Sequence, residues 1–185
     1  MNRYQDLSTF SMPTGFRGRS KWIVQAWWIV EKILFQSSPQ GLYGWRVFLL
    51  RSFGARIGKN VIIRPSVSVT YPWNLSVGDF SWIGDDVVLY TLGKIIIGNH
   101  TVVSQRTYLC AGSHDYAQVT FPITGCPIVI DDQCWLATDV FVAPGVTIGF
   151  GTVVAARSTV TRNLPGGVIA MGSPAKAVKD RRYQD

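Results

Sequence analysis

Residues 128–160 read IVIDDQCWLATDVFVAPGVTIGFGTVVAARSTV, and a large aliphatic residue occupies every sixth position of this stretch. These residues are Ile130, Leu136, Val142, Ile148, Val154 and Val160. An amphipathic helix would place apolar residues three and four positions apart, and a half-buried strand would alternate them. A period of six fits neither pattern and is typical of a β-helix, in which each hexad supplies a short strand and a corner.

The same period begins earlier in the chain, with Ile57, Ile63, Val69, Val77, Ile83, Leu89, Ile97, Val103 and Leu109. Small residues such as Gly78 and Ala137 often follow these positions. We expect each aliphatic side chain to point into a prism and each small residue to fit a tight corner. Stacked coils then bury apolar surface that a single coil would expose.

The breaks in the rhythm predict the cross-section of the prism. Within a coil the steps are six residues, whereas the steps between successive coils are eight, eight, twenty-one and six. Every insertion falls at the third corner, so residues 57–164 are predicted to form about five triangular coils of an all-β solenoid. The longest insertion is a protruding loop over residues 110–127, and a loop held by a rigid scaffold is a common place for chemistry.

Residues 1–56 are predicted to form a helical appendage. Residues 22–35, WIVQAWWIVEKILF, and residues 42–53 are apolar runs with charged interruptions, too short and too charged to span a bilayer. Two roles remain open for them. The helices can cap the first coil, since the end of a solenoid must be covered, or their tryptophans and basic residues can contact a membrane interface.

Charge and cysteine content limit the classes of partner. The net charge of +7 is concentrated in residues 1–56 and 157–185, which favours anionic partners. Residues 165–185 are predicted to form a C-terminal closing segment and basic tail. Nucleic acid is not expected, because no nucleic-acid-binding motif is present. Three cysteines cannot all pair, and no secretory signal is recognised, so we expect a cytoplasmic protein, with the inner face of the cytoplasmic membrane as an alternative location.

Several segments resemble a known family beyond the repeat itself. The loop CAGSHDY (110–116) looks like the catalytic-histidine loop of the left-handed β-helix acyltransferases with hexapeptide repeats, and residues 131–179 look like their coenzyme-A-binding coils. Within that family, the N-terminal segment DLSTFSMPTGFRGRS, the stretch SPQGLYGWR and residues 67–93 resemble the colanic-acid-type exopolysaccharide O-acetyltransferases.

This resemblance implies a left-handed β-helix that moves acetyl from acetyl-CoA to a hydroxyl of an exopolysaccharide repeat unit or its lipid-linked precursor. It also implies a homotrimer with active sites between subunits, and closed threefold symmetry is physically ordinary. Two alternatives remain: N-acetylation of an amino sugar or xenobiotic, and a non-catalytic β-helix scaffold.

His114, Asp115 and Asp86 are the candidate catalytic residues. An imidazole readily accepts a proton near neutral pH, which suits His114 as the general base for an attacking hydroxyl. The competing role for His114 is structural hydrogen bonding in the loop. Asp115 is expected either to orient the imidazole or to be a solvated loop residue. Asp86 stands near a position where related enzymes use Asn to contact the acceptor or the histidine. It could take a similar role, or it could simply belong to an acidic turn.

The resemblance also implies a set of coenzyme-binding residues. Trp135 would lie beside the pantetheine arm, or else serve only in packing, and Arg157 would either add a phosphate contact or crowd the groove. Small side chains let a ligand approach the backbone, and Lys and Arg are the expected partners of phosphates. The implied set is Trp135, Ala137, Thr138, Ala156, Thr161, Arg162, Lys176 and Lys179.

No metal is predicted. Catalytic zinc requires three protein ligands, and the sequence has only two histidines, His100 and His114, with no other ligand cluster.

Overall fold

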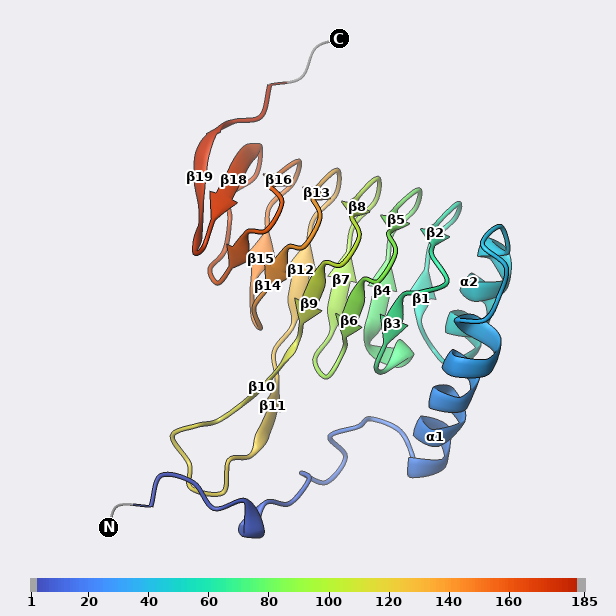
Figure 1. Cartoon of the computed structure of the whole chain (residues 1–185), viewed down its shortest axis with the longest axis vertical. Coiled ribbons are helices and arrows are strands. Elements are labelled where there is room, and N and C mark those ends of the chain that lie inside the picture. The colour runs from blue at the N-terminus through green and yellow to red at the C-terminus, as the bar shows by residue number, and fades with distance from the viewer. Residues whose placement is uncertain (1–2, 183–185) are drawn as a thin grey trace.

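The computed structural model describes residues 3–182, and their central part winds as a left-handed parallel β-helix (Figure 1). Three parallel sheets form the faces of the prism, and we call them sheets A, B and C. Sheet A holds β1 (Arg56–Ile57), β4 (Leu75–Val77), β7 (Ile95–Ile97), β12 (Ile128–Ile130) and β15 (Thr147–Ile148). Sheet B holds β2 (Ile62–Ile63), β5 (Trp82–Ile83), β8 (Val102–Val103), β13 (Trp135–Leu136), β16 (Val153–Val154), β18 (Val168–Gly172) and β19 (Ala175–Asp180). Sheet C holds β3 (Ser68–Val69), β6 (Val88–Tyr90), β9 (Tyr108–Cys110), β14 (Phe141–Val142) and β17 (Thr159–Val160).

The hexad aliphatics form the core, as the sequence predicted. All fifteen are buried, and the most exposed of them, Ile57, shows only 7% of its surface. Register stacks them coil upon coil: Ile63 pairs with Ile83, Ile83 with Val103, and Val103 with Leu136. Each coil therefore closes the apolar interior left open by the coil before it.

The corners between sheets A and B show why small residues recur there. A Cβ added to Gly78 would lie only 2.6 Å from the backbone nitrogen of Asn99 in the next coil. Along the same corner, the backbone N–H of Asp79 donates to Asn99 Oδ1, and that of Asn99 donates to Asp132 Oδ1, each at 2.7 Å. Asn99 also donates from Nδ2 to Asp132 Oδ2 at 3.1 Å. Its backbone and side-chain donations together hold the pKa of Asp132 below its ordinary value.

The solenoid continues beyond the fifth coil. Leu164 bridges to Ile148, and β18 pairs in parallel with β16, so a partial sixth coil extends sheet B past residue 164. The antiparallel strand β19 then covers the exposed edge of β18. An uncovered strand edge would invite pairing with another chain, so this hairpin closes the far end of the prism.

At the opposite end, helices cover the first coil. Helix α1 (Lys21–Val30) runs into a π-helical turn (Glu31–Phe35), and α2 (Tyr43–Ser52) follows. Short 3-10 turns lie at Leu7–Thr9 and Pro72–Asn74. None of the helices within residues 3–182 is long and apolar enough to cross a membrane.

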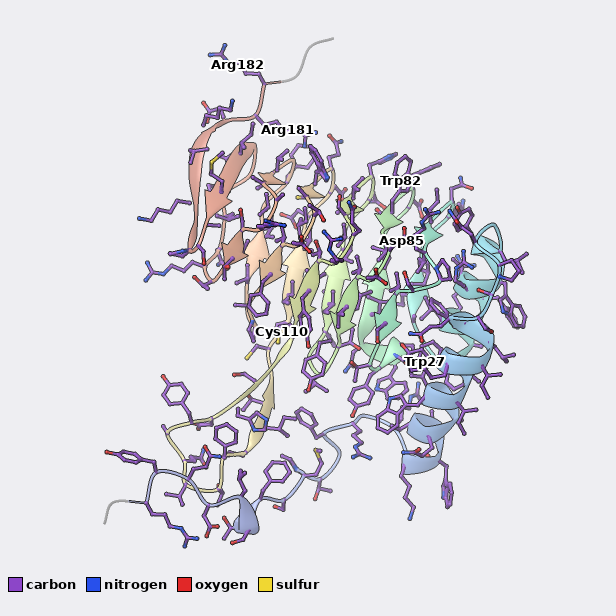
Figure 2. The ribbon with its side chains drawn as sticks, in the orientation of Figure 1. Trp27, Trp82, Asp85, Cys110, Arg181 and Arg182 are labelled. Carbon is purple, nitrogen blue, oxygen red and sulfur yellow. The ribbon has the colours of Figure 1, made fainter. Side chains whose placement is uncertain are left out.

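Side chains from these helices satisfy the free backbone groups of all three strands in the first coil. Arg51 donates to the carbonyl of Ile57 in β1, at 2.6 Å from Nη2. Arg46 donates from Nε to the carbonyl of Ile63 in β2 at 2.7 Å. In β3, Val69 donates its N–H to Glu31 at 2.6 Å and accepts from Trp27 Nε1 at 2.7 Å (Trp27 is labelled in Figure 2). The helices thus replace a missing coil in hydrogen bonding as well as in packing.

Glu31 combines burial with a carboxylate, and this predicts a pH dependence. Burial raises the pKa of Glu31 above its ordinary value of 4.5, because the charged form loses its hydration. A raised pKa in the folded state means that the folded protein binds the proton more tightly, so this contribution to stability is greatest at low pH and declines as pH rises through the raised pKa.

We therefore expect Glu31→Gln to leave the stability at pH 7 unchanged or to raise it by about 1 kcal/mol, since the amide oxygen still accepts from Val69. Denaturant unfolding between pH 4 and 7 would show a smaller loss of stability with rising pH in the variant than in the wild type. A large destabilisation at pH 7 would mean that the ionised form is required in the cap.

The predicted protruding loop is present as an antiparallel hairpin of β10 (Gly112–His114) and β11 (Ile123–Gly125), which leaves the solenoid between sheets C and A. Figure 1 shows it pointing away from the strands of sheet B. The N-terminal segment runs back along the tip of the hairpin, where the N–H of Asp6 donates to the carbonyl of Val119 at 2.8 Å. Part of the N-terminal appendage therefore braces the histidine loop.

Candidate active site

His114, at the end of β10, has a defined tautomer. Its Nδ1 lies 2.9 Å from the backbone carbonyl oxygen of Phe121. A carbonyl can only accept a hydrogen bond, so Nδ1 carries the proton and the neutral ring keeps an unprotonated Nε2. The ring of Phe121 also stacks on the imidazole, with centroids 4.3 Å apart and planes at 9°. Phe121, whose φ is 47°, therefore fixes both the ring plane and the proton position.

Asp115 stabilises the loop itself. Its Oδ1 accepts from the N–H of Ala117 at 3.0 Å and its Oδ2 accepts from Gln118 Nε2 at 2.7 Å. Both partners lie in the turn that follows, and the contact to His114 Nδ1 comes from Phe121 instead. Asp115 thus acts on the shape of the loop that carries the imidazole.

A second group of candidate residues lies at the corner between sheets B and C. Asp86 occupies this corner in the second coil, Ala137 and Thr138 in the fourth, and Ala156 in the fifth. Strand spacing in a sheet is about 4.8 Å, so successive coils form a ladder along this corner. The small side chains of Ala137 and Ala156 leave the backbone of the corner open to an approaching ligand.

A charged column runs beside these residues. Asp86, Arg106, Asp139 and Arg157 share the corner and all have positive φ, between 57° and 59°. Arg106 holds Asp139 through two hydrogen bonds of 2.7 and 2.9 Å and thereby lowers the pKa of that carboxyl. Arg157 lies 3.7 Å from the same carboxylate and is largely exposed, which leaves most of its guanidinium available to an anion.

Trp135 stands on the outer face of sheet B, about half exposed, and its Nε1 donates to Ser104 Oγ at 3.0 Å. Two strands away on the same face stands Trp82, which is 53% exposed, with Val102 between the two tryptophans. An open groove of about 340 Å³ lies over Trp82. Trp82 and Asp85, which both line it, are labelled in Figure 2. The lining of the groove includes Tyr43, Ile62, Arg64, Asp85, Ser104 and Gln105.

This groove was missed in the sequence analysis. Trp82 and Trp135 both directly precede an inward aliphatic of a sheet B hexad, so both point outward from the same face. A comparison of equivalent hexad positions would have paired them. The polar wall is organised by Arg64, whose Nε donates to Asp85 Oδ2 at 3.0 Å and whose Nη1 donates to Tyr43 at 3.3 Å. An aromatic floor beside fixed hydrogen-bonding groups is suited to a sugar ring.

The predicted phosphate-binding residues fall into two places. Lys176 and Lys179 lie on β19 and are exposed, and Lys179 lines an open pocket of about 570 Å³ with Ile169, Asp180 and Arg182. Thr161 and Arg162 directly follow β17, and so lie at the corner between sheets C and A.

The candidate residues of one chain therefore lie at two separate corners of the prism. His114, Asp115, Thr161 and Arg162 belong to the corner between sheets C and A, whereas Asp86, Ala137, Thr138 and Ala156 belong to the corner between sheets B and C. The rigid sheet C separates the two corners. The two groups of candidate residues therefore do not meet at one corner of a single chain.

Cys134 and His100 are held in contacts of their own. Burial raises the pKa of the Cys134 thiol to about 11, which disfavours a thiolate nucleophile. His100 stacks on Phe80, with ring centroids 5.1 Å apart, at the corner between sheets A and B. Within residues 3–182, no group of three His, Cys, Asp or Glu side chains is arranged to hold a metal ion.

The fold and the histidine hairpin define a class of protein. The chain superposes on a hexapeptide-repeat acetyltransferase of Vibrio cholerae with a TM-score of 0.79 and 25% identity, covering 88% of this chain and 93% of that one. A galactoside acetyltransferase solved with coenzyme A shares the fold, with a TM-score of 0.81 at 20% identity over 98% of this chain and 92% of that one. No family model matches the sequence.

Sequence relatives specify the family further. The chain is 62% identical over 177 residues to WcaF of Escherichia coli K12, whose name provisionally assigns it to colanic acid biosynthesis as an acetyltransferase. That match covers 96% of this chain and 97% of the relative. Nodulation protein L of Rhizobium meliloti is 32% identical over 136 residues, covering 71% of this chain and 73% of that protein. The chain belongs to the family of colanic-acid-type acetyltransferases, within the hexapeptide-repeat acetyltransferases.

Proposed function

We propose that this protein transfers acetyl from acetyl-CoA to a hydroxyl of a sugar in an exopolysaccharide repeat unit or its lipid-linked precursor. The observation that carries this function is the hydrogen bond from His114 Nδ1 to the Phe121 carbonyl, which leaves Nε2 of the neutral ring as a base. The family relationship supports the donor, since neighbours of this fold are solved with acetyl-CoA or coenzyme A.

The proposed reaction moves one proton, from the sugar hydroxyl to coenzyme A by way of His114, and one acetyl group, from coenzyme A to the sugar. His114 Nε2 takes the proton of the attacking hydroxyl while its oxygen bonds to the thioester carbonyl carbon. The resulting tetrahedral oxyanion collapses, the carbon–sulfur bond breaks, and the imidazolium returns the proton to the sulfur of coenzyme A. The products are an acetyl ester and free coenzyme A, without a covalent acyl-enzyme. A backbone N–H at the corner between sheets B and C would stabilise the oxyanion.

The active assembly is a homotrimer with a site at each subunit boundary. In a closed threefold arrangement, one corner of each prism faces a different corner of its neighbour. His114 of one subunit then faces Trp135, Thr138 and Ala156 of the next, which unites the two groups that a single chain keeps apart. Asp86 and Asp115 serve the site indirectly, through the corner column and the loop. Lys176, Lys179, Thr161 and Arg162 bind the phosphates of the coenzyme.

Calorimetric titration with acetyl-CoA tests the donor site without knowledge of the acceptor. We expect saturable binding at one site per subunit and a dissociation constant raised about tenfold in Lys176→Ala/Lys179→Ala, because charge-assisted hydrogen bonds to phosphate are lost. The matched control is Lys59→Ala/Lys94→Ala, which removes the same charge elsewhere and should bind normally. A folded wild-type protein that binds no acetyl-CoA at millimolar concentration would leave only a scaffold role.

The groove over Trp82 is our proposed acceptor site, since it continues along sheet B from Trp135, where the thioester would lie. Trp82→Ala should raise KM for the sugar acceptor by about tenfold, through the loss of aromatic contact with the ring, while KM for acetyl-CoA changes little. Steady-state kinetics with each substrate varied in turn separates the two constants. Equal effects on both constants would place Trp82 outside the acceptor site.

The reaction is proposed to take place in the cytoplasm, where acetyl-CoA is made and cysteines stay reduced. The structure contains three free cysteines, Cys110, Cys126 and Cys134.

A further inference from the structure

The helical cap, residues 21–52, carries an unusual concentration of exposed apolar side chains. Figure 2 shows many side chains on α1 and α2 that project away from the solenoid. The exposed large apolar residues are Trp22, Ile23, Trp28, Ile29, Ile33, Leu34, Leu42, Trp45 and Phe48, and we call this set the cap surface. Contiguous exposed apolar surface of this kind marks an interaction site.

The cap surface is organised along the helices. On α1 and the π-helical turn, Val24, Trp27, Glu31 and Phe35 are buried against the solenoid at spacings of three and four. Trp22, Ile29 and Ile33 follow the same spacing on the opposite side, and Ile33 is 62% exposed. On α2, the rings of Trp45 and Phe48 stack with centroids 5.7 Å apart, and Trp45 Nε1 donates to the carbonyl of Leu34. The two helices thus present one joined outer surface.

The exposed charged side chains of the cap and its flanking residues are basic. Between residues 7 and 78 the only acidic residue is Glu31, and it is buried, with 5% of its surface exposed. Basic residues remain exposed throughout the same part of the chain, namely Arg19, Lys21, Lys32, Arg51, Arg56 and Lys59. Lys21 lies over the ring of Trp22, 5.4 Å from its centroid. The carboxylates nearest in space, Asp79 and Asp85, belong to the second coil and are bonded to the backbone of Lys59 and to Arg64. The cap itself therefore presents apolar side chains and cations, which complement a surface that is apolar beneath an anionic layer.

We infer that the cap surface docks on an anionic lipid bilayer. Short amphipathic helices lie in the interfacial plane with their apolar side chains inserted, and Lys, Arg and Trp favour that position. A second copy of this chain is a poor occupant, because a symmetric contact would bring the same cations together without an acidic partner. The inference concerns a surface that the acetyl-transfer chemistry does not use.

Docking through the cap surface would also serve the proposed acceptor site, and this consequence rests on the proposed function. Tyr43, the first residue of α2, lines the groove over Trp82. The groove spans the first three coils, so it lies within about 10 Å of the cap at ordinary strand spacing. A sugar carried on a membrane lipid could therefore enter the groove beside α2. In a threefold trimer with its axis along the solenoid, three caps would face one bilayer and bind with avidity.

Co-sedimentation with vesicles tests the docking. The full-length protein is mixed with vesicles of phosphatidylcholine containing 30% phosphatidylglycerol, and in parallel with pure phosphatidylcholine, at low salt and at 0.5 M NaCl. We expect binding to the anionic vesicles, at least about tenfold weaker binding to neutral vesicles, and weakening by salt. Ile29→Ser/Ile33→Ser should reduce anionic binding by about tenfold through lost apolar insertion. The matched control, Gln25→Ser/Gln36→Ser on the same helical segment, should bind as the wild type does.

Three outcomes would overturn the docking. The first is a wild type that does not sediment with anionic vesicles at low salt. The second is undiminished sedimentation of Ile29→Ser/Ile33→Ser, which would assign binding to the basic tail. The third is a changed oligomeric state of that variant by light scattering, which would make the cap surface a subunit contact. Acetyl-CoA titration of the same preparations keeps the two proposals separate, because intact donor binding without vesicle binding contradicts only the docking.

Discussion

His114→Ala is expected to lower kcat for acetyl transfer by about 10²–10⁴-fold, the usual contribution of a general base. The reason is the free Nε2 of a ring whose Nδ1 proton is committed to the Phe121 carbonyl. Acetyl-CoA binding should remain within about twofold of the wild type, because the imidazole is not among the groups proposed to bind the coenzyme. Steady-state kinetics together with calorimetry on the same variant would measure both quantities. Tyr116→Ala, an exposed change in the same loop, is the matched control and should retain most of the activity.

A mixed-trimer experiment tests whether the site is shared between subunits. Ala156→Trp should be inactive because the indole would block the corner between sheets B and C, where Ala156 is exposed and the coenzyme is proposed to bind. Random co-assembly of His114→Ala with Ala156→Trp chains should restore about one quarter of wild-type activity, since each site draws its histidine from one subunit and its groove from the next. A site contained within one chain would give no restored activity in any mixture.

Arg46→Ala is expected to destabilise the protein by about 3–5 kcal/mol, the typical cost of breaking a buried charged network. The guanidinium is fully buried and donates to the carbonyls of Ile63 and Pro39, at 2.7 and 2.9 Å, and to that of Gln40. Truncation would leave these acceptors without a donor and open a void between the cap and the first coil. The free energy of unfolding from urea titration measures the effect.

The control for Arg46 is Arg51→Ala. Arg51 makes equivalent bonds to the carbonyls of Ile57 and Gly58, but it is exposed, so water can replace it. We expect a loss of about 1 kcal/mol there. Equal losses in the two variants would contradict the assignment of Arg46 as the central hydrogen-bond donor of the cap.

The hexad pattern predicted the solenoid well because the same two requirements, burial of an aliphatic side chain and a tight corner, recur in every six residues. Each six-residue unit places one aliphatic inward and one small residue at a corner, and Gly78 shows that the corner admits no Cβ. The same spacing located the hairpin, since a step of twenty-one residues from Leu109 to Ile130 cannot fit a six-residue side. The left-handed winding had to come from family resemblance, because the spacing is identical for either hand.

Arg46 and Glu31 illustrate what the local pattern missed in the cap. In the sequence they interrupt apolar runs, a pattern that predicts charges on the surface. In the structure they turn inward to the free carbonyl of Ile63 and the free N–H of Val69, which are orphaned because no coil precedes the first. Glu31 and Val69 are thirty-eight residues apart, so the local spacing of residues cannot reveal that they are hydrogen-bonded.

For the site, the amino-acid sequence predicted His114 as the base, through its place in an excursion from a strict repeat and its resemblance to a family loop. It also pointed to Ala137 and Ala156 as corner residues, because a residue with a short side chain at a fixed place in the hexad can be recognised from the spacing alone. The tautomer of His114, the role of Asp115 in its own turn, and the groove between Trp82 and Arg64 required the tertiary structure. These features depend on which backbone carbonyl meets a ring, and on which outward side chains stack in neighbouring coils. Such contacts arise only when segments twenty or more residues apart are brought into register, so the repeat determines the prism and the stacking of its coils determines the chemistry on its surface.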